Sequence, residues 1–330
     1  MNDIRLLPLS VLFASLGLFG QETTSPDPAE AIDPVETAYQ QLLELDDAAL
    51  KKIDEWIRAS QRPDAKEADT IALAGKIQAE IAPVHEAYKL FIKTHPTHAR
   101  AHLTYASFLT DIGKEDESLS LLIKATELDP NLPAAWNNLA NYYGHFGEVK
   151  KAFGHYERAI EIAPKESVYY HNFGTTVFLF RKDVREHYQI TEEEVFDKAL
   201  KLYEKALALD PKNFDLAEDI AQTYYGIRTQ DVPSRMARPA AALKAWRYAE
   251  TLAPSDFEKQ GVFVHKARAL IELMQFNDAR QQLEQVNLPI YRELRDRVGR
   301  RVPGYQATSP PEPTPTDPLR AQPPSSPPLP

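Results

Sequence analysis

The chain contains no cysteine. This absence excludes disulfide bonds, a thiol nucleophile, zinc–thiolate sites and iron–sulfur clusters. A basic surplus is also lacking, because the formal net charge is −10. Binding to a nucleic-acid backbone requires a net basic face, so nucleic acid is not expected as the main partner.

Glycine is scarce, at 12 of 330 residues, whereas long stretches are rich in Ala, Leu, Glu and Lys. These residue types favour helices. Apolar residues make up 43% of the chain, which is enough for a sizeable buried core. The composition therefore predicts a mainly helical protein.

Long apolar runs are confined to the N-terminus, where Leu6 to Phe19 reads LLPLSVLFASLGLF. The run is short for a membrane span, and small residues and a polar stretch follow it. We expect residues 1–20 to be a signal peptide cleaved near Gly20, with an uncleaved anchor as the alternative. The protein would then be exported, periplasmic or extracellular, with no integral membrane span after cleavage.

Prolines that end helices recur at a nearly fixed period. They close the motifs IKTHP, ELDP, EIAP, ALDP and TLAP, and successive prolines lie 34, 34, 47 and 43 residues apart. The two longer intervals contain insertions. A period of 34 residues is typical of helix–turn–helix repeats.

Residues 133–166 carry the clearest internal pattern. Small residues such as Ala140 and Ala152 fall where two helices would cross, and Gly147 falls at the turn between them. The full set of pattern residues is Trp136, Leu139, Ala140, Tyr143, Gly147, Ala152, Tyr156, Ala159 and Pro164. Most of it recurs 34 residues earlier, with His102 in place of Trp136 and Ser118 in place of Ala152.

This pattern resembles the tetratricopeptide repeat (TPR) family. The resemblance implies an all-α TPR α-solenoid of antiparallel helix hairpins, with N-terminal capping helices and a disordered C-terminal tail. Two sequences of the type Ser/Thr-x-x-Glu, at Thr191 and Ser255, are capping boxes that predict helix starts.

The predicted organisation follows from the repeats. After the signal peptide, residues 21–64 form a linker and amphipathic helices, and residues 65–288 form the TPR array. Its repeats span 65–98, 99–132, 133–166, 167–213 with an insertion, 214–256 with an insertion, and 257–288, which is degenerate. Residues 289–301, with five arginines, form a capping helix, and residues 302–330 are a Pro-rich disordered tail.

No catalytic or metal-binding motif is found, so we expect no catalytic residues, no metal and no cofactor. His98 and His102 lie four residues apart, but His102 occupies the packing position of Trp136. His85-Glu86 lacks the second histidine of a zinc-protease helix. Acidic runs such as Glu192–Glu194 suit the positive ends of helices.

In TPR proteins the polar residues of the first helices line a concave groove. Here these candidates are Asn137, Asn138, Asn141, His145, His171, Asn172, Thr175, Glu218, Gln222 and Tyr225. Asparagine can pair with both donors and acceptors of an extended peptide backbone, although a solvated helix face without a ligand is the alternative.

The first insertion, Phe178 to Ile190, is aromatic and basic. Its candidate binding residues are Phe180, Arg181, Arg185 and Tyr188, and simple local packing is the alternative. The favoured function is a non-enzymatic scaffold of the cell envelope that binds a protein or peptide along the concave face. An envelope enzyme built on the solenoid, or a structural subunit of a larger complex, are the rival hypotheses.

Overall fold

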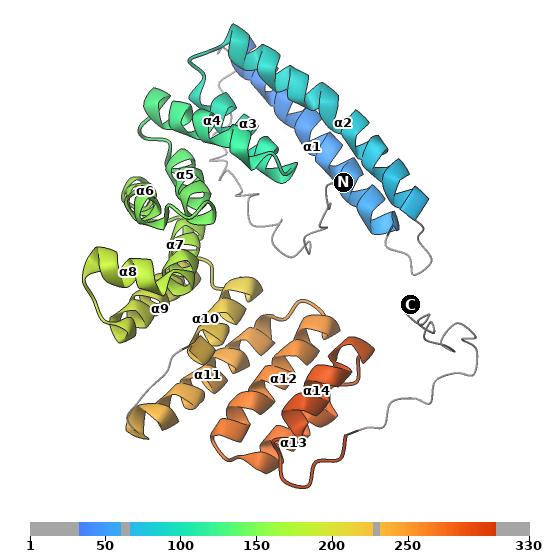
Figure 1. The fold of residues 1–330 in the computed structure, drawn as a ribbon, viewed down its shortest axis with the longest axis vertical. Coiled ribbons are helices and arrows are strands. Elements are labelled where there is room, and N and C mark those ends of the chain that lie inside the picture. The colour runs from blue at the N-terminus through green and yellow to red at the C-terminus, as the bar shows by residue number, and fades with distance from the viewer. Residues whose placement is uncertain (1–32, 61–66, 227–231, 308–330) are drawn as a thin grey trace, which may run out of the picture. The chain divides into compact units, whose positions relative to one another are not determined.

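The computed structural model describes residues 33–60, 67–226 and 232–307. The predicted signal peptide, most of the predicted linker and residues 308–330 of the predicted tail lie outside these ranges. Every regular element within them is a helix (Figure 1). None of the helices in the described part of the chain is both long and apolar enough to cross a membrane.

The helices form two compact units, Met1–Pro211 and Lys212–Pro330. Unit 1 contains α1 (Pro34–Ser60), α2 (Glu67–Thr94), α3 (Ala99–Asp111), α4 (Glu115–Leu128), α5 (Pro133–His145), α6 (Val149–Ile162), α7 (Ser167–Leu179), α8 (Arg181–Tyr188) and α9 (Glu192–Leu209). Unit 2 contains α10 (Phe214–Gly226), α11 (Val232–Leu252), α12 (Asp256–Glu272), α13 (Phe276–Glu284), a short turn of 3-10 helix (Pro289–Tyr291) and α14 (Arg292–Gly299).

Consecutive helices pair into hairpins within each unit. In unit 1 the pairs are α1 with α2, α3 with α4, α5 with α6, and α7 with α9, and α8 is inserted in the last pair. In unit 2, α10 pairs with α11 and α12 with α13, and α14 packs on α12 and α13. The predicted all-α fold of stacked hairpins is confirmed.

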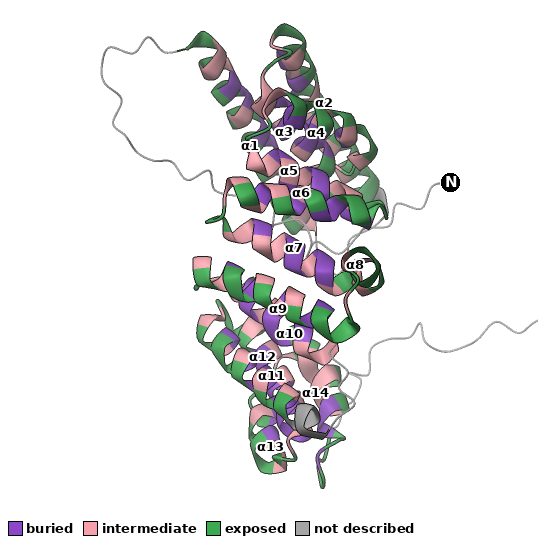
Figure 2. Cartoon of the chain, turned by 90° about the vertical axis from the view of Figure 1, so that its left-hand side faces the viewer, coloured by how far each residue is buried: buried purple, intermediate pink, exposed green. Residues whose placement is uncertain are grey.

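Burial alternates along most of the helices in the described ranges, as the sequence pattern predicts. Figure 2 shows buried stripes that face neighbouring helices and exposed stripes on the other side. In the hairpin α5–α6, Ala140, Ala152 and Ala159 are fully buried, as are Phe153 and Tyr156. Small residues at these positions let the helix backbones approach, and the aromatic rings fill the space between hairpins.

One position of the repeat carries a hydrogen bond that its residue type alone does not reveal. Trp136 Nε1 donates to the carbonyl oxygen of Pro130 at 3.0 Å, and the hydroxyl of Tyr170 donates to Pro164 at 3.2 Å. His102 Nε2 lies 3.0 Å from the carbonyl oxygen of Pro96. Histidine, tryptophan and tyrosine can therefore replace one another here, because each places a ring donor against the helix-ending proline of the preceding repeat.

Glycine is required in the turns of the first two regular hairpins. Gly113 and Gly147 have φ angles of +74° and +84°, in the left-handed region that costs other residues about 1 kcal/mol or more. The predicted capping box at Thr191 is confirmed, since Thr191 and Glu194 bond each other's backbone N–H groups. Ser255 instead caps the N–H of Phe257, and its hydroxyl contacts the carboxylate of Glu258.

The predicted first repeat, residues 65–98, is wrong in detail. These residues contain a single long helix, α2, which continues through Pro83 and pairs with α1. A proline removes one backbone hydrogen bond and tends to kink a helix. Here Ile81 and Val84, on both sides of Pro83, are buried in the cluster shared with α1, and this burial favours a continuous helix.

The predicted boundary of the tail also needs correction. Residues 302–305, assigned to the disordered tail, contact other parts of unit 2: Val302 is 3% exposed, and Arg280 donates to the carbonyl oxygen of Pro303 at 2.7 Å. The hydroxyl of Tyr305 donates to Asp296 at 2.9 Å.

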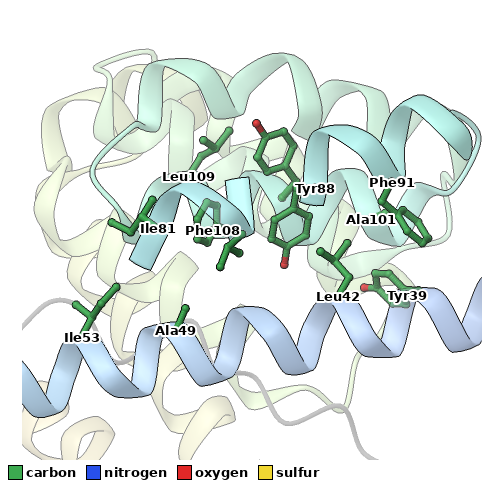
Figure 3. Packing of buried hydrophobic residues seen from close by; sticks show 12 residues of the cluster. Tyr39, Leu42, Ala49, Ile53, Ile81, Tyr88, Phe91, Ala101, Phe108 and Leu109 are labelled. Atoms are coloured by element: carbon green, nitrogen blue, oxygen red, sulfur yellow. The ribbon is translucent and has the colours of Figure 1, made fainter. Parts of the chain in front are cut away.

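An aromatic and aliphatic cluster joins α1 to α2 and α3. Figure 3 shows Tyr39 and Leu42 of α1 in this cluster together with Tyr88 of α2 and Phe108 of α3. Within it, Asp46 is only 9% exposed, and the hydroxyl of Tyr88 donates to its Oδ2 at 2.5 Å. Its other oxygen, Oδ1, is buried without a hydrogen-bond partner. Burial raises the pKa of Asp46 to about 7, and the negative charges of Asp111 and Asp47 add to this effect.

The raised pKa predicts that unit 1 loses stability as the pH rises. The pKa of Asp46 in the folded chain lies above its ordinary value of 3.8, so its contribution is fully present below that pH and is lost as the pH rises through about 7. Relative to Asp46→Asn, the wild type should lose roughly 2–3 kcal/mol of unfolding free energy between pH 5 and pH 8. Urea unfolding at both pH values measures this difference. Glu44→Gln, at an exposed carboxylate of α1, is the control and should keep the wild-type pH dependence; the same slope in all three proteins would contradict the assignment.

Candidate functional site

The predicted groove residues of unit 1 lie on the first helices of successive hairpins. Asn138 on α5 and Asn172 on α7 are separated by the repeat period, as are Asn141 and Thr175. Helix α5 lies next to α3 on one side and next to α7 on the other. The same face of α3, α5 and α7, the first helices of their hairpins, therefore contributes to one surface of unit 1.

Four polar side chains form a hydrogen-bonded row across these helices. Asn138 Nδ2 donates to Ser107 Oγ on α3 at 3.1 Å, and Asn137 Nδ2 donates to Asn138 Oδ1 at 3.2 Å. Asn172 Nδ2 on α7 donates to Asn137 Oδ1 at 3.1 Å. This polar row, Ser107, Asn138, Asn137 and Asn172, joins three consecutive hairpins.

The members of the polar row differ in their access to solvent. Asn137 is only 5% exposed, so it holds the row together and is not a freely accessible groove residue. Asn138 and Asn172 are half-buried. A carboxamide has two donor hydrogens and two acceptor lone pairs, and Asn138 uses one of each within the row. Asn138 and Asn172 therefore keep hydrogen-bonding capacity for a ligand.

Asn141 and Thr175 have a second, structural function. Each accepts a hydrogen bond from the tyrosine of the second helix of its own hairpin, Tyr156 at 2.7 Å and Tyr203 at 3.0 Å. Thr176 on α7 donates to the hydroxyl oxygen of Tyr156 at 3.0 Å. Burial raises the pKa of Tyr156 to about 12, so this tyrosine is neutral and donates across the physiological range.

The two histidines predicted for the groove lie at different depths. The side chain of His145 is 71% exposed, and its Nε2 lies 3.3 Å from a carboxylate oxygen of Glu115. His171 is half-buried, with its ring centroid 5.8 Å from that of Tyr203. Neither belongs to the polar row.

Three predicted groove residues, Glu218, Gln222 and Tyr225, belong to α10 in unit 2. Burial raises the pKa of Glu218, and Gln222 is exposed. The hydroxyl of Tyr225 donates to the carbonyl oxygen of His265 at 3.1 Å, and its ring stacks on that of His265. Tyr225 is thus mainly part of the internal packing of unit 2.

The first insertion forms α8, which packs on α6, α7 and α9. Arg181 donates to the carbonyl oxygen of Phe178 at 2.8 Å and lies over the rings of Phe178 and Phe196. The hydroxyl of Tyr188 donates to Glu157 at 2.6 Å, and Lys198 Nζ lies 4.2 Å from the centre of its ring. Arg181 and Tyr188 therefore stabilise the insertion locally.

The same insertion borders an open cleft of about 340 Å³. Its lining includes three of the four predicted insertion residues, Phe180, Arg181 and Arg185. The other lining residues are Leu179, Lys182, Asp183 and Glu192. Arg185 is exposed. In the ranges that the structure describes, no three His, Cys, Asp or Glu side chains are grouped as metal ligands.

A second cleft, in unit 2, was not predicted from the sequence. It is lined by His265 and Arg268 of α12, by Arg297 of α14 and by Arg301 just after α14, among other residues. The sequence signal was the arginine-rich segment 291–301, which we assigned to capping alone.

The stacked hairpins define an α-helical repeat protein, and comparison with known proteins specifies the repeat. Two sequence profiles described as "Tetratricopeptide repeat" match residues 99–132 and 121–153. The chain therefore contains tetratricopeptide repeats within residues 99–153. No protein in a curated set has a significantly similar sequence.

Solved structures with a similar fold include PilW, described as a widely conserved type IV pilus biogenesis factor. It has a TM-score of 0.51 and 12% identity, over 77% of this chain and 98% of PilW. YrrB, described as a TPR protein with an unusual peptide-binding site, has a TM-score of 0.49 and 15% identity, over 66% of this chain and 99% of YrrB. PilF of Pseudomonas aeruginosa has a TM-score of 0.45 and 18% identity, over 61% of this chain and 83% of PilF.

The hydrogen bonds of Tyr156 predict a measurable cost for removing its hydroxyl. In Tyr156→Phe, the buried Thr176 Oγ1 loses its acceptor and Asn141 loses its donor, so the free energy of unfolding should fall by about 1–2 kcal/mol. Chemical denaturation measures the change. Tyr170→Phe removes a hydrogen bond that is solvent-exposed, so it should cost less; equal losses in both variants would show that the Tyr156 network adds nothing.

Proposed function

We propose that this chain is a non-enzymatic scaffold that binds a protein or peptide along the face formed by α3, α5 and α7. TPR proteins bind protein or peptide partners, and this coarse function follows from the fold. The observation that supports this particular face is the polar row, because it places the amide groups of two hairpins and the Ser107 hydroxyl of a third on one surface.

The chemistry of the polar row suits a peptide main chain. An extended peptide presents an N–H donor and a C=O acceptor at every residue, and asparagine can satisfy both. The bonds within the row fix the amide orientations before a ligand arrives, which reduces the entropy lost on binding. The main chain of the partner would replace water at the donors and acceptors of Asn138 and Asn172 that the row does not use.

Substitutions in the polar row test the proposed face. The double variant Asn138→Ala and Asn172→Ala removes two half-buried amides, while the exposed Asn131, in the loop before α5, provides a matched control as Asn131→Ala. A partner captured from the native extract by the wild type and identified by mass spectrometry is then purified for titration. We expect the double variant to weaken its binding about tenfold or more, at about 1 kcal/mol for each lost hydrogen bond.

The control should bind the same partner within about twofold of the wild type, since a twofold change is only about 0.4 kcal/mol. Undiminished binding by a correctly folded double variant would move the binding site away from α5 and α7. Circular dichroism and thermal unfolding of each variant establish that the fold is intact.

We also propose that the scaffold works in the cell envelope, after removal of residues 1–20. This proposal is supported by the apolar run Leu6–Phe19, which has the length and flanks of a signal peptide. Expression of the whole chain in a bacterium should yield a periplasmic protein that begins at or near Gln21, as intact mass will show. Leu12→Arg should block export, whereas Asn2→Arg should not. An unprocessed chain in the membrane fraction would instead support the uncleaved anchor.

A further inference from the structure

A cleft of about 270 Å³ lies in unit 2 between α12 and α14. Its walls combine apolar and cationic side chains: Val264, His265 and Arg268 from α12, and Leu294, Arg297, Val298 and Arg301 from α14 and the residues that follow it. Figure 1 shows α12 and α14 side by side in this unit. The volume suits one or two side chains, and it is much too small for a folded domain.

The cationic groups of this arginine cleft lack compensating anions. Within the part of the chain that the structure describes, Arg268, Arg297 and Arg301 form no ion pair with a carboxylate. Glu272 of α12 is paired with Arg238 at 2.6 Å, and Asp296 of α14 is paired with Arg295 at 2.9 Å. Three arginine side chains thus line one small cleft in a chain whose formal net charge is −10.

The ring of His265, which lines the cleft beside Arg268, is held in place by its neighbours and is uncharged near neutral pH. The ring of His265 stacks on that of Trp246, with centroids 4.5 Å apart and planes 9° from parallel. His265 Nδ1 lies 3.3 Å from the hydroxyl of Tyr225, whose ring also carries the guanidinium of Arg268 at 4.0 Å. Burial, together with the charge of Arg268, lowers the pKa of His265 to about 4, so the imidazole adds no charge near neutral pH.

We propose that the arginine cleft binds acidic side chains of an extended peptide. The carboxylates pair with the guanidinium groups of Arg268, Arg297 and Arg301, and their methylene groups contact Val264, Leu294 and Val298. Guanidinium groups match carboxylates in shape and hydrogen-bond them in pairs. A small inorganic oxyanion is negatively charged like a carboxylate, but it has no methylene groups to contact Val264, Leu294 and Val298.

This site is separate from the polar row, and it adds a chemical class to the partner: a peptide with clustered Asp or Glu residues. The polar row is suited to the main chain, whereas the arginine cleft selects side chains. Neither site requires the other, so each can fail alone.

A fluorescein-labelled hexaglutamate peptide with a C-terminal amide is a direct probe, because the amide removes the terminal carboxylate. Fluorescence anisotropy at low salt measures its binding to the mature chain, with a hexalysine amide as the negative probe. Arg268→Gln and Arg297→Gln should each weaken binding about tenfold or more, as expected for the loss of a charge-assisted pair. Arg247→Gln, at an exposed position of α11 outside the cleft, changes the net charge equally and should leave binding within about twofold.

Competition with inorganic phosphate distinguishes a site for peptide carboxylates from a site for small inorganic anions. If phosphate binds the mature chain as tightly as the peptide, the cleft is a small-anion site and the peptide assignment is overturned. If Arg247→Gln weakened hexaglutamate binding as much as Arg268→Gln and Arg297→Gln do, the loss would be an effect of net charge, and the proposed site would be overturned. Asn138→Ala with Asn172→Ala should retain hexaglutamate binding, which distinguishes this proposal from the proposed function.

A measurement on the wild type guards against variants that fail to fold. Phenylglyoxal modifies accessible arginines, and peptide mass spectrometry reports each position. Hexaglutamate should slow modification of Arg268, Arg297 and Arg301 and leave Arg247 unchanged. If these three arginines were modified at the same rate with and without hexaglutamate, the peptide would not occupy the cleft.

Discussion

The close approach of helix backbones, made possible by alanine, is the constraint on which the repeats depend. Ala140, Ala152 and Ala159 have no exposed surface, and a larger side chain at any of them would push two helices apart. Ser118 takes the place of Ala152 one repeat earlier, and its hydroxyl donates to the carbonyl oxygen of Glu115 within its own helix. The distance between hairpins that follows from this packing brings α3, α5 and α7 close enough for the polar side chains of the row to form hydrogen bonds.

Much of the fold could be predicted because its determinants are local and periodic. Prolines end the second helices, glycines such as Gly147 allow the turns, and buried residues recur every three or four positions. The hydrogen bond from position 136 to the proline carbonyl was missed, although the exchange of His, Trp and Tyr at this position is its signal.

The features that the sequence did not reveal depend on contacts between distant segments. Helix α2 continues through Pro83 because α1 covers both sides of the proline, and nothing near Pro83 specifies that partner. Asn137 is predicted among the accessible asparagines, yet it is buried and accepts a hydrogen bond from Asn172 in the next hairpin. The arginine cleft combines α12 with α14, so neither segment alone indicates a site.

Because the helices of unit 1 differ in length, its buried contacts are distributed unevenly along the longest ones. Helices α1 and α2 have 27 and 28 residues, against 13 in α3, so they are about twice as long, near 40 Å at 1.5 Å per residue. Residues 69–80 of α2 include no buried side chain, and Lys52 with Glu80 and Lys76 with Trp56 join the two helices there. Backbone that is joined mainly by exposed polar contacts opens at a lower free-energy cost than backbone with a buried core. Hydrogen exchange in α2 is therefore expected to be faster in residues 69–80 than around Tyr88, whose side chain is buried against Asp46 of α1.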